Sequence, residues 1–79
     1  MELHQIRYFL AVCEHGGFSR AAHDCGVSQP ALTTAVKRLE TEIGGDLFHR
    51  EGRRLVLSEL GRLVKPHLEK LSGEKDAAM

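Results

Sequence analysis

The fold is decided by one stretch of this 79-residue chain, residues 18–40, which reads FSRAAHDCGVSQPALTTAVKRLE. The spacing of its apolar residues predicts two helices, over about residues 19–25 and 28–43. Gly26 lies in the short turn between them, where a helix commonly ends in a left-handed residue. Two helices joined by a short turn that contains glycine are typical of a helix-turn-helix.

The second of these helices has a defined start and two different faces. Ser28 is its expected N-cap. Because Pro30 has no N–H to donate in the first turn, the Ser28 hydroxyl should accept from the N–H of Ala31 instead. The spacing predicts a buried stripe at Leu32, Val36, Leu39 and Ile43, and a small or polar opposite face at Pro30, Thr33, Thr34 and Lys37.

Regular elements are expected on both sides of this pair. An amphipathic helix is predicted over about residues 3–15, and Ser19 is the expected N-cap of the helix that follows it. Residues 47–48 and 55–57 are short β-prone runs, which predicts a β-hairpin with its turn at residues 50–53.

Ser58 should cap a last helix that ends at about residue 71 or 72. Pro66 should kink or break this helix, because proline lacks the N–H that a helix interior needs. The predicted fold is mainly α, a winged helix-turn-helix with a three-helix core, a β-hairpin wing and a C-terminal linker or dimerisation helix. The expected organisation is a DNA-binding domain over residues 1–57, a linker helix over 58–72 and a disordered tail over 73–79.

Positive charge is concentrated in the middle of the chain, although the formal net charge is zero. Residues 28–65 carry seven basic and five acidic side chains, whereas residues 1–27 and 66–79 each carry two basic and three acidic ones. DNA-binding domains are usually basic, because they neutralise phosphates and release counterions. The neutral total therefore predicts weak non-specific affinity for DNA.

The second helix of the pair and the hairpin carry groups that suit DNA. A recognition helix reads the major groove with its N-terminal residues and one exposed face. Gln29 can make paired hydrogen bonds to adenine, and a helix start such as the one at Ser28 can hold a phosphate. The remaining candidates are hydroxyl or cationic side chains for bases and phosphates, namely Thr33, Thr34, Lys37, Arg38, Arg50, Arg53 and Arg54. The alternatives are a solvated helix face and a charged hairpin tip that keeps the protein soluble.

The last helix carries an apolar stripe that is long for so small a core. It can pack against its own domain or pair with another chain, and at least part of it should meet a partner. A homodimer also fits the logic of two-fold DNA sites read by two recognition helices. The residues of the stripe, expected to serve dimerisation, are Leu60, Leu63, Val64, Leu68 and Leu71.

Other functions find little support in the sequence. Cys13 and Cys25 lie on inward helix faces, which favours core packing over a thiol sensor. No His and Cys spacing suits a metal site, and no nucleophile or phosphate-loop motif is present, so we expect no metal, no cofactor and no enzyme activity. The chain has neither an apolar run of about 18 residues nor a signal-peptide pattern, which favours a cytoplasmic protein with no membrane partner.

The chain resembles the amino-terminal domain of LysR-type transcriptional regulators over about residues 1–71, without an insertion. The matching motifs are FSRAA at 18–22, VSQPAL at 27–32, RLE at 38–40, LF-x-R at 47–50, GRR at 52–54 and LS-x-x-G at 57–61.

The resemblance implies bacterial origin, a dimerising linker helix and sequence-specific binding of double-stranded DNA to regulate transcription. The implied DNA site is an interrupted inverted repeat, bound usually as a tetramer in a full-length form. Thr34 and Ala35 stand where relatives often have longer polar or basic side chains. The family's effector-binding domain is missing here, so no small-molecule effector is expected for this chain. An alternative is a dimerisation module that pairs with relatives without productive DNA binding. Carried over by residue, the implied DNA contacts are Gln29, Pro30, Thr33, Thr34, Lys37, Arg38, Arg50, Arg53 and Arg54.

Overall fold

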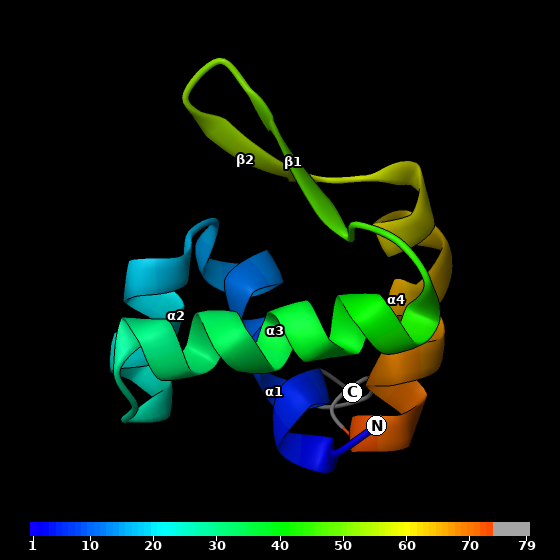
Figure 1. The fold of residues 1–79 in the computed structure, drawn as a ribbon, viewed down its shortest axis with the longest axis horizontal. Helices are drawn as coiled ribbons and strands as arrows, with labels where there is room; N and C mark the ends of the chain where they lie inside the picture. Colours follow the sequence, from blue (N-terminus) through cyan, green and yellow to red (C-terminus); the bar gives the residue numbers. More distant parts are fainter. Residues whose placement is uncertain (74–79) are drawn as a thin grey trace.

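Three helices form the body of the fold, and a hairpin and a fourth helix follow them in the chain (Figure 1). The structure, a computed structural model, describes residues 1–73. The predicted disordered tail therefore lies outside the described residues, except for Gly73. The elements are α1 (Leu3–His15), α2 (Phe18–Cys25), α3 (Gln29–Ile43), β1 (Phe48–Glu51), β2 (Arg54–Leu57) and α4 (Glu59–Ser72).

The helix-turn-helix is formed by α2 and α3. As predicted, the Ser28 hydroxyl accepts from the N–H of Ala31, at 3.2 Å, and Gly26 ends α2 in a left-handed conformation with φ 73°. The prediction that Ser19 caps α2 is wrong, because the N-cap is Gly17 and the helix begins at Phe18. An early start fits the packing, since the Phe18 ring meets the ring of Phe48 edge-on, at 5.9 Å between centroids.

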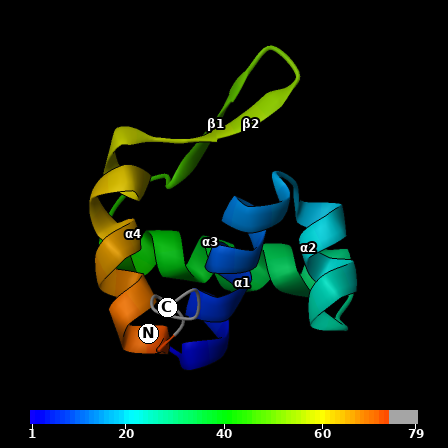
Figure 2. The same cartoon turned by 180° about the vertical axis from the view of Figure 1, so that it is seen from behind.

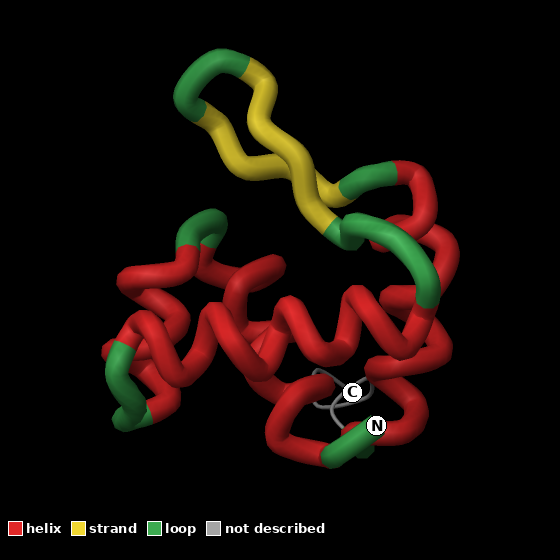
Figure 3. The backbone as a smooth tube through the Cα atoms, in the orientation of Figure 1, coloured by secondary structure: helices red, strands yellow, loops and turns green. Residues whose placement is uncertain are grey.

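The two strands form an antiparallel hairpin that stands away from the helical body (Figures 1 and 3). Its turn is shorter than predicted, because Arg50 and Glu51 belong to β1 and pair with Leu55 and Arg54 of β2. The chain reverses at residues 52–53, where Gly52 adopts a φ of 62° that favours glycine.

The fourth helix is capped by Ser58 as predicted, with the Gly61 N–H donating to its hydroxyl at 2.9 Å. Pro66 does not break α4, which is helical over its whole length. Both Pro66 and Arg62 are exposed, so water can satisfy the Arg62 carbonyl that loses its helical partner.

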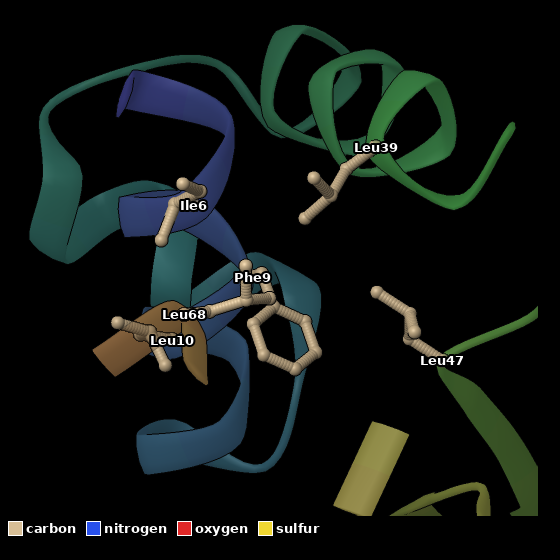
Figure 4. Packing of buried hydrophobic residues seen from close by; sticks show 6 residues of the cluster. All are labelled: Ile6, Phe9, Leu10, Leu39, Leu47 and Leu68. Atoms are coloured by element: carbon tan, nitrogen blue, oxygen red, sulfur yellow. The ribbon is translucent and has the colours of Figure 1, made fainter. Parts of the chain in front are cut away.

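The hydrophobic core joins α1, α3 and α4 around the segment that leads into the hairpin. Six buried side chains form its main cluster, namely Ile6, Phe9, Leu10, Leu39, Leu47 and Leu68 (Figure 4). A second cluster joins α1, α2 and α3 at Ala11, Val12, Ala21, Ala22, Leu32 and Val36. Figure 2 shows from behind that α4 and α2 lie at opposite ends of α3.

The core corrects the predicted dimerisation stripe. Leu68 is only 3% exposed, because it packs among the core residues of α1 and α3. Leu60 and Val64 are partly buried against the same cluster. Only Leu63 and Leu71 keep large exposed fractions, 67% and 64%. A partner chain can therefore reach part of the stripe, but not Leu68.

Candidate nucleic-acid interface

The candidate interface combines α3 with the hairpin, which borders a shared groove. Thr33, Val36 and Lys37 line this groove from α3, and Phe48 and Arg50 line it from β1. Its volume is about 210 Å³. We call it the wing groove; its other lining residues are Phe18, Glu40, Asp46, His49 and Leu55. Three of the predicted candidates, Thr33, Lys37 and Arg50, thus meet in one place, although the helix and the hairpin are far apart in the sequence.

The start of α3 presents the polar side chains that the sequence predicted. Ser28, Gln29, Pro30 and Thr34 are all exposed. The Gln29 Nε2 donates to the hydroxyl of Thr33 at 2.9 Å, one turn along the helix. This bond holds the amide group along the helix while the Gln29 side chain stays accessible. The Ser28 hydroxyl is already engaged as the helix cap.

The predicted α3 residues divide between two flanks of the helix. Thr33 is half-buried and lies in the wing groove with Lys37. Thr34 and Arg38 instead line a second hollow of about 410 Å³ on α3, together with His4 of α1. Sequence reasoning missed His4, because nothing in its neighbourhood in the chain indicates that the first turn of α1 lies beside α3.

Lys37 has a carboxylate close to its ammonium group. Its side chain is 71% exposed, and its Nζ lies 3.7 Å from Oε1 of Glu40. Glu40 is itself buried, at 8% exposed, and its Oε2 accepts from the backbone N–H of Leu47 at 2.7 Å. Sequence reasoning also missed Glu40, since only the folded chain brings Leu47 to it.

The hairpin presents three exposed cations. Arg50 donates from Nη1 to the backbone carbonyl of Arg53 at 3.4 Å, which stiffens the tip. Among residues 1–73, no ion pair involves Arg50, Arg53 or Arg54, and Glu51 pairs with His49 at 3.3 Å. With no carboxylate partner in this part of the chain, the guanidinium groups can contact phosphate or a minor groove.

The base of the hairpin is fixed by aromatic packing. The Phe48 ring lies 5.3 Å from the Phe9 ring of α1 and 5.9 Å from the Phe18 ring of α2, measured between centroids. Contacts of this kind add stability beyond the area they bury. The strands that carry the arginines thus start from a position set by the helical body.

The described residues also bear on metal-ligand, thiol and membrane features. No group of three or more His, Cys, Asp and Glu side chains is placed to hold a metal ion within residues 1–73. Burial raises the pKa of the Cys13 thiol to about 11, which opposes a role as a reactive thiolate. Neither Cys13 nor Cys25 forms a disulfide. In the same residues, no helix has both the length and the apolar character that crossing a membrane requires.

Comparison with known proteins identifies a matching family and relatives whose similarity extends over all of this chain. The family model described as bacterial regulatory helix-turn-helix protein, lysR family, matches residues 3–62. The chain is 44% identical over 79 residues to the HTH-type transcriptional regulator BudR of Raoultella terrigena, and 43% identical over 79 residues to the BudR regulator of Klebsiella aerogenes. Both matches cover all of this chain, but only 27% of the first relative and 55% of the second.

Solved structures with the same fold include complexes with DNA. The BenM_DBD/catB site 1 DNA complex superposes with a TM-score of 0.85 at 33% identity, covering 99% of this chain and 88% of that one. The CbnR_DBD-DNA complex superposes with a TM-score of 0.83 at 32% identity, covering 99% and 97%. The winged helix fold predicted from the sequence is confirmed by these likenesses.

Proposed function

Because the chain belongs to the LysR family of bacterial regulatory helix-turn-helix proteins, we propose that it binds double-stranded DNA in a sequence-specific manner to regulate transcription. One observation carries the proposal: Thr33 and Lys37 of α3 line the same groove as Arg50 of the hairpin, whose arginines form no ion pair within residues 1–73. A module of this shape can read base edges with the helix and hold the backbone with the wing. The DNA complexes of the BenM and CbnR domains, which share this fold, support it.

The residues divide into two roles. Gln29, Pro30, Thr33 and Thr34 enter the major groove, where the amide of Gln29 can bond adenine and the threonine methyls can meet thymine. The cations and the helix start contact the backbone or the minor groove, with Lys37 and Arg38 also able to reach guanine; this set is Ser28, Lys37, Arg38, Arg50, Arg53 and Arg54.

Selection from a random duplex library tests the proposal directly. The selected duplex should bind more tightly than a scrambled one, and its affinity should fall steeply with salt, with a slope near −0.9 per phosphate contacted. Arg53→Gln should make that slope shallower by about 0.9. Lys70→Gln is the matched control, because Lys70 is exposed in the last turn of α4, and that end of the helix lies away from the hairpin (Figure 1). Binding that does not change with salt, or no enrichment of any sequence, contradicts the proposal.

We propose further that the exposed part of α4 pairs two copies of the chain, with a tetramer only in a full-length form. Leu63 and Leu71 are large apolar side chains left exposed, which indicates a surface that a second helix covers. Glutamate at both positions should shift the chain to a monomer in sedimentation experiments. His23→Glu should leave the assembly intact, because His23 is exposed on α2, which lies at the opposite end of α3 from α4 (Figure 2). Unchanged assembly in the double variant contradicts this pairing.

The same surface supports a second candidate, a module that pairs with a longer relative and binds no DNA productively. The chain spans about a quarter of the Raoultella regulator and about half of the Klebsiella one. Mixing the protein with a full-length relative separates the two candidates: heterodimers that fail to bind the selected duplex favour the second. We propose neither effector sensing nor enzyme activity for this chain. A cytoplasmic location fits the regulation of bacterial DNA.

A further inference from the structure

Glu40 is a carboxylate in a groove that should attract phosphate. It lines the wing groove and is one of two buried polar or charged residues, with Gln5, among residues 1–73. Negative charge at this position opposes DNA binding. The fold must therefore gain something from keeping an acid beside its proposed DNA-reading helix.

The two oxygens of Glu40 have different partners of different strength. Oε2 accepts the short bond from the buried Leu47 N–H, and losing this bond leaves a buried donor unpaired. Oε1 faces Lys37 at 3.7 Å, in a pair whose cation is mostly exposed. Such a pair is weak, so Lys37 can exchange the carboxylate for another acceptor. Glu40 remains fixed by Leu47 when the ammonium leaves.

We propose that Glu40 determines specificity by neutralising Lys37 until the cognate DNA supplies another acceptor for its ammonium, an inference that rests on the proposed function. On non-cognate DNA, the phosphates meet a Lys37–Glu40 pair without net charge, so Lys37 adds little to counterion release. On the cognate site, the helix is seated in the major groove and a phosphate takes the ammonium. Glu40 thus weakens non-specific binding more than specific binding.

Glu40→Gln isolates the charge from the structural bond. Glutamine keeps a side-chain oxygen that can accept from Leu47, but it no longer neutralises Lys37. Asp46→Asn is the matched control, because Asp46 lines the same groove, is exposed, and forms no ion pair within residues 1–73. Each substitution removes one negative charge from the groove, and only the first one frees Lys37.

The experiment measures the dissociation constants for the selected duplex and a scrambled duplex, with Lys37 present and in a Lys37→Met background. Glu40→Gln should tighten binding to the scrambled duplex by about threefold, the size that a mostly exposed ion pair allows. It should change binding to the selected duplex less, so the specificity ratio falls. Asp46→Asn should shift both constants alike, and without Lys37 the effect of Glu40→Gln on the ratio should vanish.

Four results would overturn the inference. The inference is overturned if Glu40→Gln and Asp46→Asn change the specificity ratio equally. It is also overturned if Glu40→Gln has its full effect on that ratio in the Lys37→Met background. If Glu40→Gln does not fold by circular dichroism, Lys37→Met alone decides: the salt slope should drop by about 0.9 on the selected duplex and stay unchanged on the scrambled one. Equal drops on both duplexes refute the inference alone, whereas no salt-sensitive binding by the unmodified protein refutes the proposed function as well.

Discussion

Gly61 offers a sharp test of how the wing is held against the helices. It lies in the first turn of α4, where a Cβ would overlap the carbonyl oxygen of Leu47 and come within 2.8 Å of Cδ2 of Leu57. The Leu47 oxygen also accepts from the N–H of Ser58 at 2.9 Å. The obstacle is backbone on one side and a half-buried leucine on the other, so Gly61→Ala must displace the segment that leads into the hairpin.

The expected magnitude follows from three terms. Overpacking a tight site costs about 1–3 kcal/mol. Weakening the Ser58–Leu47 bond adds about 1 kcal/mol. The greater helix propensity of alanine returns about 1 kcal/mol. Because the last two terms cancel, Gly61→Ala should lower the free energy of unfolding by about 1–3 kcal/mol, the cost of overpacking. For a domain of this size, the melting temperature should fall by roughly 5–20 °C.

Thermal unfolding followed by circular dichroism measures this loss. Gly45→Ala is the matched control: its Cβ would approach the Cδ2 of Leu60 to 2.9 Å, and the end of that side chain can move aside. Gly45→Ala should therefore cost clearly less than Gly61→Ala. A Gly61→Ala protein that melts at or above the temperature of the unmodified protein would falsify the close approach of α4 to Leu47.

Three further predictions concern single side chains. Ser28→Ala removes the hydroxyl that caps α3 and should lower the free energy of unfolding by about 1 kcal/mol in urea titrations; an unchanged midpoint contradicts the cap. Burial raises the pKa of Cys13 to about 11, so the stability it contributes is full below its usual value of about 8.5 and is lost as the pH rises through 11. As the pH rises to 11, the free energy of unfolding should therefore fall less for Cys13→Ala than for the unmodified protein. Parallel plots of this free energy against pH would contradict the burial of Cys13. Leu68→Ala should lower the free energy of unfolding by about 2–5 kcal/mol, since the Leu68 side chain is in the core. As a control, His67→Ala should change it by less than about 0.5 kcal/mol, because His67 is exposed. Similar losses in the two variants would contradict the burial of Leu68.

The parts of the fold that depend on neighbouring residues could be predicted from the sequence. The start of α3 follows from Ser28 and Pro30 alone, and the start of α4 follows from Ser58, because capping bonds join residues three apart. The exposed face of α3 follows from helical spacing, since one periodicity separates buried from exposed positions. The DNA-contact candidates on α3 and on the hairpin are nearly all exposed as that spacing requires, with Thr33 half-buried.

The remaining features depend on where distant segments meet. Ser19 has the residue type of an N-cap, but the cap is Gly17, two residues earlier, and the helix includes Phe18, whose ring packs on Phe48. The spacing of the α4 stripe could not separate Leu68, which the core buries, from Leu63, which it leaves exposed. His4 joins the interface only because α1 lies against α3. No local pattern carries that information.

The position of the wing is set by its attachments to the helices, at Leu47 as well as at Phe48, and not by the hairpin itself. A two-stranded hairpin is at best marginally stable alone, so its orientation must come from the body of the fold. Leu47 directly precedes β1 and has three attachments: its side chain is fully buried, its N–H donates to Glu40 of α3, and its carbonyl accepts from Ser58 at the start of α4. Gly61 gives α4 the room to approach that carbonyl. Leu47 thus joins α3, the hairpin and the start of α4. A displacement of α4 at Ser58, such as pairing of two chains could cause, should therefore be transmitted to the wing groove between α3 and the hairpin.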